Sequence, residues 1–229
     1  PVLNQAQYVP DDWNDANQSH AAKLLDAIQN RFWMEGIFAG KYPQEIFDDF
    51  GSELSDVIKP GDLEGAQVKN DLLGINFYFD TRVAKPKSGE IDPFDFSAIW
   101  NLNIDSTPKG PLTDMGWPIT PEGLENLLVR WHREYGDKLP PIYITENGVA
   151  YDDAPNAEGK VTDVRRIDYL AKHLKAVKNA AAKGAPMAGY FQWSLMDNFE
   201  WALGYEKRFG MVYVDRKSTR LNSSHTDIS

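Results

Sequence analysis

The sequence predicts an α/β protein built around a parallel β-sheet. Two observations support this class: short apolar runs typical of buried strands recur along the chain, and helix-length amphipathic stretches separate them. Strands that alternate with helices indicate βαβ crossovers, which join parallel strands. Because parallel strands all end at the same edge of a sheet, residues just after each strand are the first candidates for a functional site.

The first half of the chain contains one long predicted helix and two predicted strands. Apolar residues recur at helical spacing from Asp15 to Gly40, and a short helix is expected over residues 42–50. The run at 71–79 (DLLGINFYF) is continuously apolar, which is typical of a strand buried on both faces. Residues 1–4 are a candidate for a further short strand.

The second half repeats the alternation of strand and helix. Residues 80–119 are rich in Pro, Gly, Asp and Ser without any period, which indicates a long functional loop. Helices are expected to begin after Thr120 and Asp163, and strands to occupy 141–145 and 187–195. The expected inward faces are Leu124, Leu127, Leu128, Trp131 and Tyr135 in the first helix, and Val164, Ile167, Leu170, Leu174 and Val177 in the second.

These four strands are too few for a closed (β/α)8 barrel, which has eight strands and typically about 250 residues. They form either a small open sheet or half of a barrel. Residues 216–229 (RKSTRLNSSHTDIS) are polar and aperiodic at the point where a helix should follow the strand-like run 210–215. We therefore expect residues 1–215 to be the domain, and 216–229 to be a non-native or disordered tail.

Composition excludes several classes of function. Of the 229 residues, 24 are Lys or Arg and 34 are Asp or Glu, so a net charge of −10 argues against a nucleic-acid partner. No run is long and apolar enough for a membrane span, and no leader pattern begins the chain, so we expect a soluble, cytoplasmic protein. Cys is absent, the four His are scattered, and nucleotide-binding motifs are missing, so neither a metal nor a cofactor is expected.

Acidic and aromatic residues follow three of the strands. Glu146 has two interpretations: a solvated side chain before an Asn-Gly tight turn, or a carboxylate nucleophile at the mouth of a strand. Tyr78 is either a core aromatic or a hydroxyl donor that holds this carboxylate. Glu200 and Trp201, with Trp193, offer the hydrogen-bond acceptors and the apolar face that a sugar ring requires.

Several motifs resemble glycoside hydrolase family 1, the family of the β-glucosidases. The last two strands and their loops carry ITENG at 144–148 and WSLMDNFEWALGYEKRFGMVYVD at 193–215. Earlier segments that fit are NRFWMEGIFAGKYP at 30–43, LGINFYF at 73–79 and MGWPITPEGL at 115–124. The resemblance implies a retaining β-glucosidase with a TIM-barrel fold and a β-glucoside or short β-linked oligosaccharide as substrate.

The same resemblance implies roles for individual residues. Glu146 matches the catalytic nucleophile and Tyr78 the tyrosine that hydrogen-bonds it. The substrate-binding residues that it implies are Asn76, Trp193, Glu200, Trp201, Phe209 and, on the aglycone side, Trp117. Relatives that act on 6-phosphorylated sugars hold the phosphate with a serine and a lysine, whereas the carboxylate of Glu200 favours an unphosphorylated sugar.

One essential part of that family is missing from the sequence. The family's acid/base residue lies in an Asn-Glu-Pro motif after its fourth strand, and this motif does not occur here. The chain therefore resembles the carboxyl-terminal half of the catalytic domain, strands five to eight, and we expect little activity from it alone. Open sheet edges predict self-association or pairing with the missing amino-terminal half. The alternative is a non-catalytic carbohydrate-binding or structural half-barrel.

Overall fold

A four-stranded parallel sheet forms the centre of the protein. The structure is a computed structural model, and it describes residues 1–51, 56–83, 110–216 and 220–221. The order of the strands in space is their order in sequence, and every neighbouring pair is parallel. The strands are β1 (Val2–Asn4), β3 (Leu73–Asn76), β5 (Ile142–Asn147) and β6 (Met187–Gln192). The predicted α/β class and all four predicted strands of the sheet are confirmed, although β3 and β6 are shorter than expected.

The long helix predicted to end at Gly40 consists of three segments. These are α1 (Ala16–Asp26), a π-helical turn η1 (Ala27–Arg31) and α2 (Phe32–Ala39). The Asp15 side chain accepts hydrogen bonds from the amides of the first turn, and Gly40 ends α2 with a left-handed φ of 65°. Among the described residues that follow, the short helices are α3 (Gln44–Phe50) and α5 (Asp62–Ala66).

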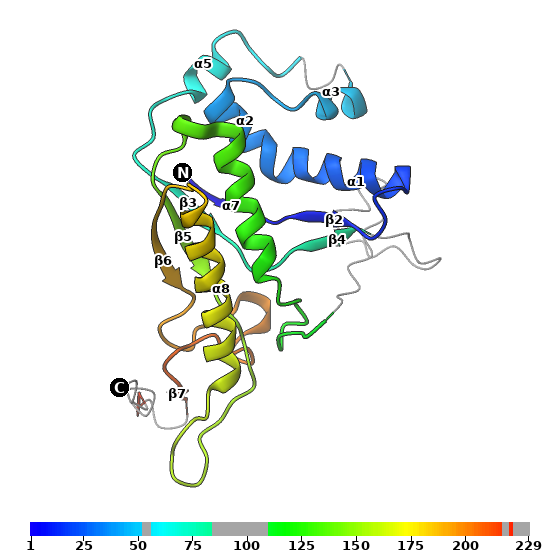
Figure 1. Ribbon diagram of the computed structural model, residues 1–229. Coiled ribbons are helices and arrows are strands. Elements are labelled where there is room, and N and C mark those ends of the chain that lie inside the picture. The colour runs from blue at the N-terminus through cyan, green and yellow to red at the C-terminus, as the bar shows by residue number, and fades with distance from the viewer. Residues whose placement is uncertain (52–55, 84–109, 217–219, 222–229) are drawn as a thin grey trace.

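Two longer helices, α7 (Pro121–Tyr135) and α8 (Val164–Ala182), lie side by side along the sheet in Figure 1. All five residues expected on the inward face of α7 are buried. They pack against Leu73, Ile75, Ile142 and Ile144 of the sheet, which together with them form the main core. Thr120 precedes α7 but does not cap it, because its Oγ1 accepts a hydrogen bond from the Asp80 amide instead, at 2.8 Å.

The expected inward face of α8 is wrong at three of its five residues, whereas Leu170 is half-buried and Val177 packs against the main core. Val164, Ile167 and Leu174 are 64%, 60% and 47% exposed, and the helix instead buries Arg166, Tyr169, His173, Ala176 and Ala180. The polar members of that second set find partners inside the protein: the Arg166 guanidinium pairs with Asp153 and Asp163, and the Tyr169 hydroxyl bonds the Asn147 amide. These contacts offset much of the cost of burying the polar face, although Nε of Arg166 and Nε2 of His173 have no hydrogen-bond partner among the described residues, so the apolar stripe did not decide the orientation.

In the described part of the chain, two small sheets lie outside the main one. β2 (Tyr8–Pro10) pairs in parallel with β4 (Thr81–Val83), so part of the expected 80–119 loop is strand, whereas its residues 84–109 lie outside the described residues. β7 (Val214–Asp215) pairs antiparallel with β8 (Arg220–Leu221). The remainder of the tail, residues 217–219 and 222–229, also lies outside the described part of the chain.

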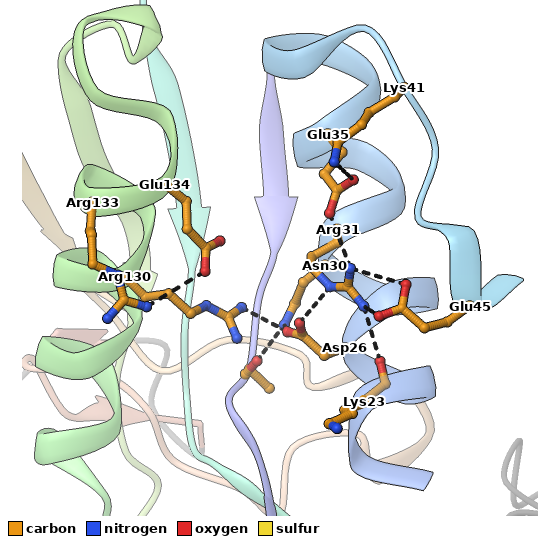
Figure 2. Close-up of polar contacts among 11 residues, drawn as sticks. Lys23, Asp26, Asn30, Arg31, Glu35, Lys41, Glu45, Arg130, Arg133 and Glu134 are labelled. Atoms are coloured by element: carbon orange, nitrogen blue, oxygen red, sulfur yellow. Dashed lines mark hydrogen bonds and ion pairs between the residues drawn. The ribbon is translucent and has the colours of Figure 1, made fainter. Parts of the chain in front are cut away.

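A charged cluster joins the helices on either side of β1, as Figure 2 shows. The side chain of Asp26 is 12% exposed, and its carboxylate accepts hydrogen bonds from Arg130 of α7 at 2.7 Å and from Arg31 at 3.0 Å. The Arg31 guanidinium also contacts Glu35 and Glu45. Because a buried carboxylate needs paired cations to offset its desolvation, this cluster fixes α1 against α7.

Candidate active site

A cleft of about 480 Å³ opens at the carboxyl end of the sheet, a volume within the range of ligand pockets. Seven of the eight residues implied as site residues line it, namely Asn76, Tyr78, Trp117, Glu146, Trp193, Glu200 and Trp201. They come from the ends of three different strands and from the loops that follow them. The tertiary structure thus brings together side chains that are far apart in the sequence.

Glu146 is the half-buried carboxylate at the end of β5. Its Oε2 accepts a hydrogen bond of 2.8 Å from the hydroxyl of Tyr78, two residues beyond β3. Burial, and the carboxylate of Glu146 beside it, raise the pKa of Tyr78 above its ordinary value. The phenol therefore stays protonated at neutral pH and acts only as a donor to the carboxylate, which holds Glu146 in one orientation.

A bulge in β5 turns Glu146 toward the cleft. Ile75 pairs with Ile144 and Asn76 pairs with Glu146, so Thr145 has no partner on β3, and the β6 side of the ladder slips at the same place. Ile142 and Ile144 face the helix core, so strict alternation would send Glu146 outward as well. The extra residue reverses the alternation, which is a common use of bulges beside functional sites.

Asn147 secures the strand directly after Glu146, and it was not anticipated from the sequence. Its fully buried Nδ2 donates to the Phe77 carbonyl at 2.7 Å and to the Tyr169 hydroxyl at 3.0 Å. Its Oδ1 accepts from the Tyr190 hydroxyl at 2.6 Å. The amide thereby ties β5 to the neighbouring strands and to α8, which leaves little freedom to the backbone that carries Glu146.

The tight-turn interpretation of Asn147-Gly148 is wrong. Asn147 is the last residue of β5, and Gly148 is a point of close backbone approach rather than a hairpin corner. A Cβ atom at position 148 would lie 1.8 Å from the carbonyl oxygen of Trp193. Glycine is therefore required for β5 and the segment after β6 to approach each other at the floor of the cleft.

The loop after β6 presents Glu200 and Trp201. Oε2 of Glu200 accepts a hydrogen bond of 2.7 Å from Nδ2 of Asn198, and Asp197 anchors the loop by an ion pair with Arg208. Trp201 is 84% exposed and has a left-handed φ of 44°, which is uncommon for a residue other than glycine. The exposed indole is available for stacking on an apolar ligand face.

Aromatic rings form one wall of the cleft. The ring centroid of Trp117 lies 5.3 Å from that of Tyr78 and 5.1 Å from that of Phe79. Phe209 was expected to line the pocket, but it is fully buried behind the wall, with its centroid 6.3 Å from Tyr78 and 6.1 Å from Trp117. Phe209 is not among the residues that line the cleft, so it supports the rings of Tyr78 and Trp117 from the core.

Sequence reasoning missed half of the lining of this cleft. The missed residues are Asn4, Gln5, Ala6, Tyr8, Gln29, Phe79 and Thr81. Asn4, Gln5 and Ala6 come at the carboxyl end of β1, so the strand-end rule that identified Glu146 also applied to them. Gln29 lies in the π-helical turn, for which the sequence carried no signal that we recognised.

Charge in the cleft is entirely negative among the described residues: two carboxylates and no Lys, Arg or His line it. In the same described ranges, no group of three or more His, Cys, Asp or Glu is placed to hold a metal ion. Within these ranges also, no helix has the length and apolar character needed to cross a bilayer.

The sequence profile described as Glycosyl hydrolase family 1 matches residues 1–226. The chain belongs to glycosyl hydrolase family 1. The match includes residues 216–226, which we expected to lie outside the domain. Among relatives, β-glucosidase A of Thermotoga maritima is 40% identical over 215 residues, and a 6-phospho-β-galactosidase of Clostridium acetobutylicum is 38% identical over 224 residues.

Solved structures of the family share the fold. A psychrophilic β-glucosidase from Micrococcus antarcticus superposes with a TM-score of 0.84 at 37% identity, covering 96% of this chain and 49% of that one. The T. maritima β-glucosidase in complex with deoxynojirimycin superposes with a TM-score of 0.77 at 33% identity, covering 98% of this chain and 47% of that one. The match to β-glucosidase A of T. maritima covers 93% of this chain and 45% of that protein. The match to the 6-phospho-β-galactosidase of C. acetobutylicum covers 89% of this chain and 46% of that protein. This family member therefore spans about half the length of the proteins it matches.

Proposed function

We propose that this chain is the carboxyl-terminal half of a retaining β-glucosidase domain, strands five to eight of a (β/α)8 barrel, with Glu146 as its nucleophile. The position of Glu146 carries the proposal, because it shares one cleft with Glu200 and Trp201 and receives a hydrogen bond from Tyr78. Further support comes from the half-length matches and from a parallel sheet whose strand order follows the sequence.

The proposed chemistry is a double displacement. The Glu146 carboxylate attacks the anomeric carbon, the bond to the leaving oxygen breaks, and a glycosyl ester forms on Glu146; water then hydrolyses this ester. Tyr78 restrains the attacking carboxylate and keeps its own proton. Because the carboxylate is already oriented before the sugar binds, less entropy is lost in reaching the transition state.

The sugar itself is proposed to occupy the space between Glu200, Trp193 and Trp201. A carboxylate accepts hydrogen bonds from sugar hydroxyls, and indole rings stack against the apolar face of the ring. Asn76 would add an amide contact near the reacting carbon, and Trp117 would form the aglycone side of the cleft.

An unphosphorylated sugar fits this cleft better than a phosphorylated one. A 6-phosphate dianion would face two carboxylates, and none of the described lining residues supplies a cation. Some relatives are 6-phospho-β-galactosidases, which by name act on phosphorylated galactosides. The negative lining therefore favours a neutral β-glucoside for this chain.

The isolated chain is proposed to hydrolyse ordinary glucosides poorly. Retaining hydrolysis needs a second carboxyl group about 5 to 5.5 Å from the first to protonate the leaving oxygen, and such acid catalysis contributes about 10²- to 10⁴-fold. No Asn-Glu-Pro segment is present to supply the family's acid. The strands β1 and β6 form the two edges of the sheet, and we propose that they pair with the missing half or with a second copy.

Covalent labelling tests the nucleophile without requiring an acid. A 2,4-dinitrophenyl 2-deoxy-2-fluoroglucoside has a leaving group that departs unprotonated, so Glu146 alone should form a stable glycosyl ester, detected by peptide mass spectrometry. Glu146→Gln should abolish the label, while Glu158→Gln, at an exposed position outside the cleft, should retain it. The matching 6-phospho reagent should label more slowly.

Labelling at another residue, or none at all in folded protein, would overturn Glu146 as the nucleophile. Binding of a glucoside without any labelling would instead favour the non-catalytic carbohydrate-binding half-barrel. Rapid turnover of cellobiose by the purified chain would contradict the missing acid.

A further inference from the structure

We propose that Thr145 is a positioning residue that fixes the side-chain amide of Asn76 with its N–H donors facing the cleft. The inference rests on the proposed function only in its statement of what those donors bind. It concerns a residue whose side chain is not part of the cleft lining and which belongs to the ITENG motif without having been assigned a role there.

The bulge in β5 gives Thr145 its place. Thr145 is the extra residue, so it has no partner on β3 and its side chain can turn toward the neighbouring strand. Its Oγ1 donates a hydrogen bond of 2.6 Å to Oδ1 of Asn76. One bulge therefore serves two residues: it turns Glu146 into the cleft and sets Thr145 against Asn76.

The glycine at position 74 leaves room for the side chain of Thr145. A Cβ atom at Gly74 would lie only 2.8 Å from Cγ2 of Thr145 and 2.9 Å from Cγ2 of Val2. The Thr145 methyl thus occupies room that exists only because residue 74 is glycine. Since β-branched side chains have few rotamers, a methyl that lies beside Gly74 also sets the position of the hydroxyl.

The Thr145 hydroxyl donates to Oδ1 and so defines the orientation of the Asn76 amide in the structure; because a hydroxyl can also accept a hydrogen bond, the preference over a reversed amide comes from the charge of the cleft. The oxygen and nitrogen of an amide point in opposite directions, so an Oδ1 held by Thr145 leaves Nδ2 directed away from it. In the part of the chain that the structure describes, no hydrogen-bond acceptor is recorded for Nδ2, and Asn76 lines the cleft. Nδ2 therefore offers two donors to the space beside Glu146.

Electrostatics favour the same orientation. The cleft contains the carboxylates of Glu146 and Glu200 and no cation among its described lining residues. A reversed amide would turn a carbonyl oxygen toward this negative lining, whereas the N–H groups face it favourably. We infer that these donors bind an oxygen of the sugar or of Glu146.

Side-chain amide NMR tests the inference independently of any activity. In the full chain labelled with ¹⁵N-asparagine, the Nδ2 protons of Asn76 should show NOEs toward Glu146 and none toward the Thr145 methyl. Thr145→Val, which keeps the shape but removes the hydroxyl, should shift and broaden the Asn76 signals. Thr145→Ser keeps the hydroxyl and should change them far less, and thermal melting confirms that each variant is folded.

Thr145→Ala provides a second arm if the valine variant does not fold, because it removes the hydroxyl without adding a methyl in its place. Asn76 signals that remain unchanged in both the valine and alanine variants would overturn the inference. NOEs from Nδ2 to the Thr145 methyl in the wild-type chain would do the same.

A binding measurement separates this inference from the proposed function. Calorimetric titration with deoxynojirimycin should show an affinity that Thr145→Val weakens about tenfold and Thr145→Ser weakens less than threefold. Failure of the wild-type chain to bind deoxynojirimycin contradicts the proposed sugar site, while the NMR comparison still decides the role of Thr145. Equal affinities in wild type and Thr145→Val contradict the donor role.

Discussion

The hydroxyl of Tyr78 donates a hydrogen bond of 2.8 Å to Oε2 of Glu146, joining the segments at the ends of two neighbouring parallel strands. The two residues are 68 positions apart in sequence. Their contact depends on β3 and β5 lying next to each other and on the bulge that turns Glu146 inward. Measurements on either residue therefore test the arrangement of the strand ends at the carboxyl edge of the sheet.

Replacing Tyr78 with phenylalanine should slow covalent labelling of Glu146 about tenfold or more. The phenylalanine keeps the ring contacts with Trp117 but no longer restrains the carboxylate, which then samples unproductive orientations. The measurement is the rate of ester formation with the dinitrophenyl reagent. Because burial keeps the pKa of Tyr78 above its ordinary value, the effect should be constant across the neutral pH range. Tyr205→Phe, at an exposed position outside the cleft, is the matched control, and an equal loss in both variants would contradict the prediction.

Gly148→Ala should destabilise the fold by about 2 kcal/mol or more, in the range of overpacking changes. The new Cβ would meet the Trp193 carbonyl oxygen at 1.8 Å, and backbone cannot move aside as the end of a side chain can. Chemical denaturation of the variant measures the loss. Gly65→Ala is the control, since nothing lies within 4 Å of its added Cβ and the residue is helical. Similar stabilities for the two variants would show that the close approach is absent.

Arg166→Met should cost about 3 to 5 kcal/mol of unfolding free energy, the range for removing one partner of a buried ion pair. The guanidinium is 1% exposed and contacts Asp153, Asp163 and the Arg208 carbonyl. Its loss removes the guanidinium that pairs with both carboxylates. Lys172→Met on the same helix removes an exposed pair with Asp168 and should have no measurable effect on the melting midpoint. A small effect of Arg166→Met would show that α8 does not bury this face.

His173 should make the protein less stable as the pH falls. Burial lowers the pKa of His173 from its ordinary 6.5 to about 4, so the unfolded chain binds the proton first. The stabilising contribution of the neutral ring is complete above about pH 6.5 and is lost as the pH falls toward 4. His173→Phe should remove this dependence while preserving the stacking on Tyr169.

The pH range above 7 serves as the control for the comparison of wild type with His173→Phe. Above pH 7 the ring is neutral in both folded and unfolded wild type, so the difference in unfolding free energy between wild type and His173→Phe should be constant there. Between pH 6.5 and 4 wild type should lose stability relative to His173→Phe. Parallel stability curves down to pH 4 would argue against a buried neutral histidine.

Helix α7 shows where sequence reasoning was sufficient. Its buried residues follow a single apolar stripe, and that stripe packs on the sheet as expected. Helix α8 has two competing faces. Much of the more apolar stripe is exposed, because the other face carries an arginine and a tyrosine whose partners include Asp153 and Asn147 outside the helix. The buried histidine bonds the Tyr169 carbonyl of the same helix. Hydrophobic periodicity alone does not include the energy of such contacts.

The candidate site also contains residues that the sequence identified and residues that it did not. Strand-end position and motif identified Glu146, Tyr78, Glu200 and Trp201, and all four line one cleft. The residues that hold them, such as Asn147 and Asn198, were missed because their role lies in hydrogen bonds to other segments. Phe209 belongs to the right motif but lies behind the cleft, since a motif does not specify which side of a loop faces solvent.

By itself the sequence determined the α/β class, the four parallel strands, the core face of α7 and the chemical types of side chain at the strand ends. Periodicity and turn residues encode these features locally. The tertiary structure alone decided which face of α8 is buried, where β5 bulges, and hence that Glu146 points into the cleft. These outcomes depend on the register between strands and on polar partners tens of residues away, whose geometry exists only once the chain has folded.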